Sequence, residues 1–353
     1  MMKPFSRIRG QEQAKAVLSA AVDSGRLAHA YILAGPDGSG RLTAALDLAR
    51  VLICREDRTG FCGECRHCRQ IDDLSHPDVR FTIPMLKTTG PGEVAELLTA
   101  RASDGVTPLR FPGNTYVSIE QIREIEGRLS KKSFEGRGYV EIMTDAHLMR
   151  REAANAMLKT LEEPPPHTLI ILITSSLSGL LPTVRSRAHT VRFGRLPKHT
   201  VEKVLLERGI PEPRAHRLSL LSDGCPGRAL LQADADLEET PMASELLEAA
   251  ISGIAPMEAA VLAGEIAGKL GREGVMELCA EMVSLAHDTR RAAAGAEPLE
   301  RESVTFLEAA DDSILQAVVD GMRLCQTRIR ANVSPPMALA AALGAAAEIA
   351  STR

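Results

Sequence analysis

The stretch His29-Ala-Tyr-Ile-Leu-Ala-Gly-Pro-Asp-Gly-Ser-Gly-Arg-Leu-Thr43 decides the fold of this chain. A short apolar run, Tyr31 to Ala34, leads into the glycine-rich loop Gly35-x-x-Gly38-x-Gly40, and an apolar run of helical character follows from Leu42 to Leu52. Strand, glycine-rich loop and helix in this order form a P-loop, whose backbone N–H groups surround the phosphates of a nucleotide. The sequence therefore predicts the scaffold of a nucleotide site.

The side chains that give such a loop its chemistry are replaced. A working P-loop has Lys after the second glycine, to neutralise the β- and γ-phosphates, and then Ser or Thr, whose hydroxyl ligates Mg²⁺. Arg41 and Leu42 stand in these two places. A planar guanidinium does not substitute freely for an ammonium group, and Leu cannot coordinate a metal. Thr43 comes one residue late, and one helical residue is a turn of about 100°, so its hydroxyl is expected to point away from the metal position.

A second loss lies on another predicted strand, Tyr139 to Met143, which ends in Thr144 and Asp145. In a working ATPase of this architecture two acids end the strand, one for Mg²⁺ and one for the attacking water. Thr144 replaces the first acid, and Asp145 is one methylene shorter than a Glu at the second, a misplacement that can cost about a hundredfold in rate. Both residues are also compatible with simple helix capping. The sequence thus predicts a nucleotide fold that has lost catalysis.

Four of the seven cysteines, Cys54, Cys62, Cys65 and Cys68, fall within one short segment. In a reducing compartment such a group indicates metal ligands rather than disulfides, and four thiolates suit a structural, tetrahedral Zn²⁺. An iron–sulfur site is less well matched, because the further Cys-Pro of bacterial ferredoxins is missing. Unliganded cysteines are the simpler alternative. The polar neighbours, such as Arg55, Glu56 and Asp57, offer no core to bury them, which favours zinc.

The order of elements predicts a doubly wound α/β domain with a parallel sheet. Leu169-Ile-Ile-Leu-Ile-Thr174 has the continuous apolar character of a parallel strand buried on both faces. Ser118 and Gln121 form a capping-box pattern that begins a helix ending at Leu129. We expect a core domain over residues 1–195 with the cysteine segment 54–68 as an insert, a small helical lid over 196–236, and an all-helical domain over 237–353. The loop-rich segment 86–114 has no assignable role.

Composition excludes several classes of protein. No run of about 18 uncharged apolar residues occurs and the N-terminus lacks an apolar signal segment, so we expect a cytoplasmic protein without a membrane span. The formal net charge is −4, Trp is absent, and Tyr and Phe are few. A free-standing nucleic-acid binder would usually be basic and would offer aromatic stacking platforms.

The motifs together resemble those of bacterial DNA polymerase III clamp-loader subunits, which belong to the AAA+ family. Within that family the decayed motifs are most similar to the delta-prime type, whereas gamma/tau subunits keep Lys-Thr and Asp-Glu. In chain order the resemblance rests on Gly10-Gln11, His29-Ala30, the degenerate loop, the four-Cys insert, His76-Pro77-Asp78, Thr144-Asp145-Ala146, Ala154 to Pro165, Ser186-Arg187 and Asn332-Val333-Ser334-Pro335.

The resemblance implies an AAA+ core, a lid, and a C-terminal collar that oligomerises in a five-subunit ring with gamma/tau and delta subunits. It also implies that Arg187 is an arginine finger, which stabilises phosphate charge in the ATP site of the neighbouring subunit. Ala188 stands where the family has Cys, and Arg185 is close enough to compete for the assignment. Arg187 as a simple surface ion pair remains the alternative. Arg228 matches the sensor-2 position of the lid, although a structural role fits it equally well.

These observations predict a non-hydrolysing subunit that completes the ring, supplies Arg187 to a neighbour and helps to load the sliding clamp on primer-template DNA. ATP binding by the degenerate loop is doubtful. One alternative is a gamma/tau-like ATPase that uses Arg41 and Thr43 in unusual roles. A second alternative is a nucleic-acid-binding protein in which the cysteine cluster is a zinc module.

Overall fold

A computed structural model describes residues 3–54, 60–130, 133–135, 137–234, 241–294, 311–331 and 333–351. Three sequence-based expectations fall outside these ranges: residues 55–59 of the cysteine segment, the domain boundary expected after residue 236, and Asn332. By its internal contacts the chain divides into two compact units, which are Met1–Arg208 with Ser222–Asp234, and Gly209–Leu221 with Ala235–Arg353. Among the described residues, no helix combines the length and apolar character that crossing a bilayer requires.

The first unit is built on a five-stranded sheet in the order β2-β3-β4-β1-β5, with every neighbouring pair parallel. The strands are β1 (Ala30–Ala34), β2 (Val79–Thr82), β3 (Tyr139–Met143), β4 (Thr168–Thr174) and β5 (His189–Arg192). All seven residues of β4 are buried, as the continuous apolar run predicts. Because β1 lies between β4 and β5, the order of strands reverses beside it, and ligands of open α/β sheets bind at the carboxyl edge of such a point.

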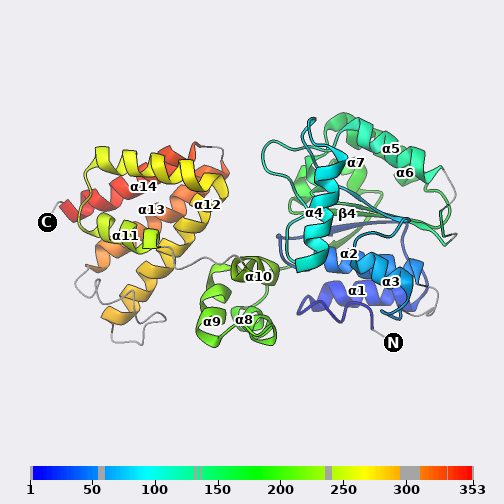
Figure 1. Ribbon diagram of the computed structural model, residues 1–353, viewed down its shortest axis with the longest axis horizontal. Helices are drawn as coiled ribbons and strands as arrows, with labels where there is room; N and C mark the ends of the chain where they lie inside the picture. The colour runs from blue at the N-terminus through cyan, green and yellow to red at the C-terminus, as the bar shows by residue number, and fades with distance from the viewer. Residues whose placement is uncertain are drawn as a thin grey trace. The chain divides into compact units, whose positions relative to one another are not determined.

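Two helical layers cover the sheet (Figure 1). Successive residues of β1 and β4 alternate between the apolar cores of the two layers. One layer contains α1 (Glu12–Asp23), α2 (Arg41–Ile53) and α3 (Arg66–Asp72), and the other contains α5 (Ile119–Leu129), α6 (Arg151–Glu162) and the short α7 (Pro182–Arg185). The predicted doubly wound fold is therefore confirmed.

The capping box that the sequence predicts at the start of α5 is present. The Ser118 hydroxyl accepts from the Gln121 N–H at 3.3 Å, and the Gln121 side chain accepts from the Ser118 N–H at 3.0 Å, which completes the capping box. Two single-turn 3₁₀ helices, η1 (Ala146–Leu148) and η2 (Leu177–Gly179), follow β3 and β4.

The segment without an assignable role forms α4 (Pro91–Asp104) and the loop after it. Partly buried residues of α4, including Leu97 and Leu98, pack with Leu109 and Ile83 beside Leu42 of α2. The loop after α4 therefore reaches the first turn of α2, where the phosphate-binding loop ends.

Three helices follow the sheet: α8 (Lys198–Glu207), α9 (Glu212–Leu221) and α10 (Pro226–Asp234). By contacts α8 and α10 belong to the first unit, and α9 belongs to the second. The second unit also contains α11 (Pro241–Ile251), α12 (Pro256–Ala293), α13 (Asp312–Arg330) and α14 (Pro335–Ser351), which share one apolar core. The backbone of α12 kinks at Gly271, where φ is 65°. The expected division into core, lid and collar at residues 195 and 236 stays a prediction.

Candidate nucleotide site and metal centre

The glycine-rich loop lies between β1 and α2, as predicted from the sequence. Only glycine fits at position 35, because a Cβ there would lie 2.3 Å from the carbonyl oxygen of Phe193, which follows β5. Gly40 has φ of 96° and precedes the first residue of α2. Gln11 fastens the loop from outside, since its amide donates to the carbonyl oxygens of Ser39 at 3.3 Å and Gly194 at 2.7 Å.

Arg41, at the position of the P-loop lysine, turns back onto its own loop. Its guanidinium Nη2 donates to the carboxylate of Asp37, four residues earlier, and the Arg41 side chain is only 6% exposed. The positive charge that would neutralise a phosphate is thus paired with an internal carboxylate. Leu42 is partly buried between the apolar core of the α1–α2–α3 layer and the apolar residues of the segment after α4. Thr43, the next residue in the first turn of α2, is half-buried.

Arg110, from the loop after α4, joins the glycine-rich loop to the residues that follow β3. Its Nη2 donates to the second carboxylate oxygen of Asp37, and its Nε lies 3.5 Å from a carboxylate oxygen of Asp145. The Thr144 hydroxyl donates to the carbonyl oxygen of Leu109 at 3.0 Å. Thr144, Asp145 and the glycine-rich loop are therefore brought together, but they meet across Arg110 and its loop.

The pKa values of the two acids differ because their surroundings differ. Burial opposes ionisation of Asp37, but the guanidinium groups of Arg110 and Arg41 outweigh it and lower the pKa of that carboxyl below its ordinary value of 3.8. Burial dominates at Asp145 and raises the pKa of its carboxyl despite the nearby Arg110. Of the two acids, Asp37 is the one whose surroundings favour the carboxylate form.

The amino end of α10 rests directly on the loop. The Gly227 N–H donates to the Gly38 carbonyl oxygen at 2.9 Å, and a Cβ on Gly38 would lie 2.6 Å from the backbone nitrogen of Arg228. Gly38 also has φ of 77°, which disfavours other residues. The expected sensor-2 residue Arg228 therefore starts beside the loop, and its side chain is exposed.

Arg187 lies between α7 and β5, close to the amino end of β5. The glycine-rich loop follows the carboxyl end of the parallel strand β1, so the two lie toward opposite ends of the strands. Arg187 Nε donates to Glu162 Oε1 at 2.7 Å, and its Nη1 donates to the carbonyl oxygen of Thr183 at 3.0 Å. An ion pair of the kind that the simpler interpretation of Arg187 requires is thus present. Arg185, the competing candidate, is an exposed residue at the end of α7.

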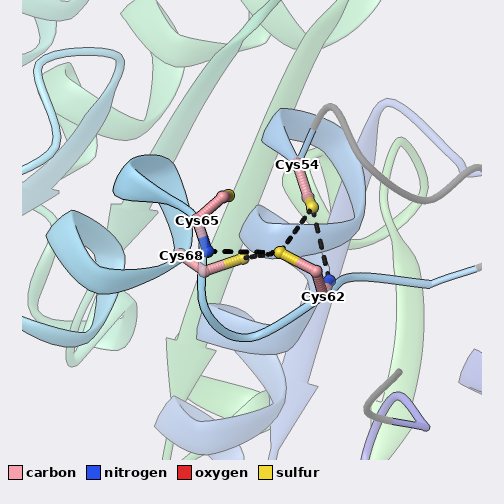
Figure 2. A group of neighbouring side chains, drawn as sticks. All are labelled: Cys54, Cys62, Cys65 and Cys68. Atoms are coloured by element: carbon pink, nitrogen blue, oxygen red, sulfur yellow. Dashed lines mark hydrogen bonds between the residues drawn. The ribbon is translucent and has the colours of Figure 1, made fainter.

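The four cysteines of the insert converge at one point (Figure 2). Their sulfur atoms all lie within 4.8 Å of one another, with Cys54 Sγ 3.7 Å from Cys62 Sγ and Cys62 Sγ 3.9 Å from Cys68 Sγ. Four sulfurs at about 2.3 Å from a tetrahedral Zn²⁺ would be about 3.8 Å apart. The donor set and its spacing therefore fit zinc, and among the described residues this is the one group of potential ligands that could hold a metal ion.

Backbone geometry prepares Cys62 to be a thiolate. Burial opposes this, but N–H groups of Glu64 and Cys65, at 3.5 and 3.3 Å from the sulfur, lower the pKa of Cys62 to about 7. Burial raises the pKa of Cys68. Deprotonation of a buried thiol of this kind is favoured by a bound cation.

The cluster has an apolar base that sequence reasoning missed. Cys54 and Cys68 are buried with Phe61, whose ring centroid lies 5.4 Å from the guanidinium carbon of Arg50. The expectation that these cysteines have no core to enter is therefore wrong. Arg137 also donates to the Cys54 carbonyl oxygen at 2.9 Å, which fastens the end of α2.

A sequence profile of the family described as DNA polymerase III, delta subunit, matches residues 10–197, more than half of the 353 residues. The chain belongs to this family. This confirms the resemblance to bacterial clamp-loader subunits of the AAA+ type.

Curated proteins named gamma/tau and curated proteins named delta' are both similar to this chain. DNA polymerase III subunit gamma/tau of Mycobacterium tuberculosis is 28% identical over 349 residues, 92% of this chain and 53% of the relative. DNA polymerase III subunit delta' of Bacillus subtilis is 30% identical over 213 residues (60% and 56%), and that of Pseudomonas aeruginosa is 33% identical over 203 residues (56% and 54%). The chain spans about half the length of these curated relatives.

Two solved structures from Thermotoga maritima align with it at low similarity. A gamma subunit-related protein has a TM-score of 0.35 and 21% identity, covering 79% of this chain and 97% of that one. The RuvB Holliday junction branch migration motor has a TM-score of 0.38 and 16% identity, covering 90% of each.

In this member of the delta-subunit family, sequence reasoning missed Asp37 and Arg110. A carboxylate inside a phosphate-binding loop was a usable signal for Asp37, because it places negative charge where phosphate oxygens would lie. Arg110 gave no signal, since 73 residues separate it from Asp37.

Proposed function

We propose that this chain is a non-hydrolysing, delta-prime type subunit of the bacterial DNA polymerase III clamp loader. It completes a five-subunit ring with gamma/tau and delta subunits, and helps the complex to load the sliding clamp on primer-template DNA. The observation that carries the proposal is the bridge from Asp37 through Arg110 to Asp145 in the degenerate site.

The bridge reproduces the charge pattern of a bound nucleotide without one. In a working site a cation lies between phosphate oxygens and the acids at the end of the strand. Arg110 takes the place of that cation, and the Asp37 carboxylate takes the place of a phosphate as the partner of Arg41. Leu42 supplies no metal ligand. The chain therefore supplies charged partners of its own at Arg41 and Asp145, which supports a structural rather than a hydrolytic role.

Arg187 supplies the charge that a neighbour requires. The degenerate loop follows the carboxyl end of β1, whereas Arg187 precedes the amino end of β5, and these strands are parallel. A head-to-tail ring needs two such different faces on every subunit, one for each neighbour. This placement supports the finger, and the motif Ser186-Arg187 assigns it to Arg187 rather than to Arg185.

The test is the ATPase rate of the complex reconstituted with gamma/tau and delta subunits. Arg187→Ala should lower turnover at the site it completes by at least about tenfold, since arginine fingers contribute far more than that in related phosphoryl transfer. Arg185→Ala is the matched control and should leave the rate near that of the wild type. An unchanged rate with Arg187→Ala would remove the trans role.

One observation favours the rival function, a gamma/tau-like ATPase. Arg41 Nη1 and Ser39 Oγ are buried and have no hydrogen-bond partner within the part of the chain that the structure describes. A loop with such donors could satisfy them with an anion. ATP turnover by the purified chain would establish this rival.

We further propose that Cys54, Cys62, Cys65 and Cys68 hold a structural Zn²⁺. The cluster joins the end of α2 to the start of α3, and two of its cysteines are buried. Four protein ligands leave no open position on a tetrahedral ion, so the site stabilises the fold and supplies no reaction. This inward arrangement gives the nucleic-acid-binding alternative no support.

A further inference from the structure

The guanidinium of Arg187 is engaged almost completely by its own chain. Nε and Nη2 both approach Glu162 Oε1, at 2.7 and 2.5 Å. Nη1 donates to the Thr183 carbonyl oxygen at 3.0 Å and to the Ser186 hydroxyl at 3.2 Å. A guanidinium has five N–H bonds, and these contacts use four of them.

Glu162 occupies the Nε–Nη2 side of the Arg187 guanidinium, which is the side that an arginine finger uses to bind phosphate. Nε and Nη2 form a planar fork that binds carboxylates and phosphates in the same geometry. The fork cannot serve both anions at once, so Arg187 can reach a phosphate through it only after the Glu162 contact breaks.

Glu162 is an unfavourable residue for its own helix. It is the last residue of α6, where the partial negative charge of the helix end disfavours a carboxylate. Pairing with Arg187 offsets that repulsion. The contact with Arg187, and not the stability of α6, therefore accounts for a carboxylate at position 162.

We propose that Glu162 is a latch for Arg187: its carboxylate holds the guanidinium fork in the free subunit, and a phosphate of the neighbour's nucleotide displaces it in the ring. This inference rests on the proposed function of Arg187. Glu162 is a positioning residue, since it acts on the nucleotide only through Arg187.

The exposure of the pair makes the exchange possible. The side chains of Arg187 and Glu162 are 34% and 51% exposed, and an ion pair this accessible shifts an equilibrium by a factor of about two to five. A nucleotide phosphate carries more charge and lies in a subunit interface with less water, so it outcompetes the carboxylate. The latch thus weakens the finger modestly without disabling it.

The first experiment measures the ATP concentration for half-maximal ATPase rate in the reconstituted complex. Glu162→Gln keeps the side-chain size and removes the charge, and it should lower that concentration about two- to fivefold. Glu163→Gln removes the same charge from the neighbouring residue, for which the described residues show no ion pair, and should change little. In an Arg187→Ala background, Glu162→Gln should have no effect. Equal values for Glu162→Gln and Glu163→Gln would overturn the latch.

A second experiment uses the purified chain and needs no ATPase activity. A dicarbonyl reagent such as phenylglyoxal modifies accessible guanidinium groups, and peptide mass spectrometry reports the rate at each arginine. Glu162→Gln should raise the rate at Arg187 about two- to fivefold relative to Glu163→Gln, with Arg185 as the internal reference. Equal rates at Arg187 would overturn the latch even when the finger itself is established. Glu162→Gln could raise the modification rate at Arg187 while Arg187→Ala leaves the ATPase rate of the complex unchanged. That result would overturn the finger but would establish the contact between Glu162 and Arg187.

Discussion

The guanidinium of Arg110 donates to the carboxylate of Asp37, a residue 73 positions earlier in the chain. This contact explains the loop-rich segment to which the sequence assigns no role. The segment packs on the first turn of α2, its Leu109 carbonyl accepts from Thr144, and its Arg110 fills the space between the loop and Asp145. The glycine-rich loop and the residues after β3 are thus joined by a contact between distant parts of the chain.

Restoring the lost P-loop residues alone should therefore not restore ATP binding. In Arg41→Lys with Leu42→Thr, Asp37 still repels phosphate and Arg110 still crosses the site. Adding Asp37→Ala should tighten ATP binding by at least about tenfold, because it removes a carboxylate that repels phosphate and releases the side chains at positions 41 and 110 that the carboxylate holds. Isothermal titration calorimetry with Mg-ATP compares the two variants. Equal affinities would show that the bridge does not obstruct the loop.

The Asp37 bridge should make stability depend on acid pH. The pKa of Asp37 is lowered in the folded state, so its contribution is fully present above the ordinary value of 3.8 and is lost as the pH falls through the folded-state pKa. The contribution is about 1 kcal/mol or less, since the Asp37 side chain is 40% exposed. Urea unfolding from pH 7 to pH 3 measures it as the difference between wild type and Asp37→Asn. A difference that grows toward low pH would contradict the bridge.

The close approach of α10 to the loop predicts the effect of one methyl group. Gly38→Ala and Gly105→Ala both place a side chain at positive φ, 77° and 71°, which costs about 1–2 kcal/mol in each. Only the Cβ at Gly38 meets another backbone, at 2.6 Å from Arg228 N, whereas nothing lies within 4 Å of the one at Gly105. The free energy of unfolding should thus fall further for Gly38→Ala, by about 1–3 kcal/mol. Equal losses in urea titrations would mean that α10 does not rest on the loop.

The cysteine cluster predicts a metal content of about one Zn²⁺ per chain. Cys68→Ser should lose the metal and lower the melting temperature, because metal binding contributes to folding. Cys225→Ser changes a buried cysteine outside the cluster and should retain the metal. Elemental analysis of protein purified in reducing buffer decides the point, and zinc-free wild-type protein would exclude the structural site.

Sequence reasoning succeeds where the determining residues are close together along the chain. The capping box of α5 needs only Ser118 and Gln121, and the buried strand β4 is predicted from the six consecutive residues Leu169 to Thr174. The convergence of the four cysteines follows from their spacing.

It fails where a contact joins distant segments. The pairing of Arg110 with Asp37, the seat of α10 on Gly38 and the Glu162–Arg187 pair depend on how whole elements pack. Local sequence patterns carry no information about such pairs, since they do not show which residues distant in the chain come into contact. The position of the loop between β1 and α2 could thus be predicted, but the contacts of Arg110 with Asp37 and Asp145 could not.

The most direct test of the closed site is equilibrium binding and turnover of Mg-ATP by the purified wild-type chain. With Asp37 paired to Arg41 and Arg110, we expect no binding at ATP concentrations up to the millimolar range and no turnover above the background of an Arg41→Ala variant. Stoichiometric ATP binding with turnover that Arg41→Ala abolishes would contradict the account and identify an active ATPase.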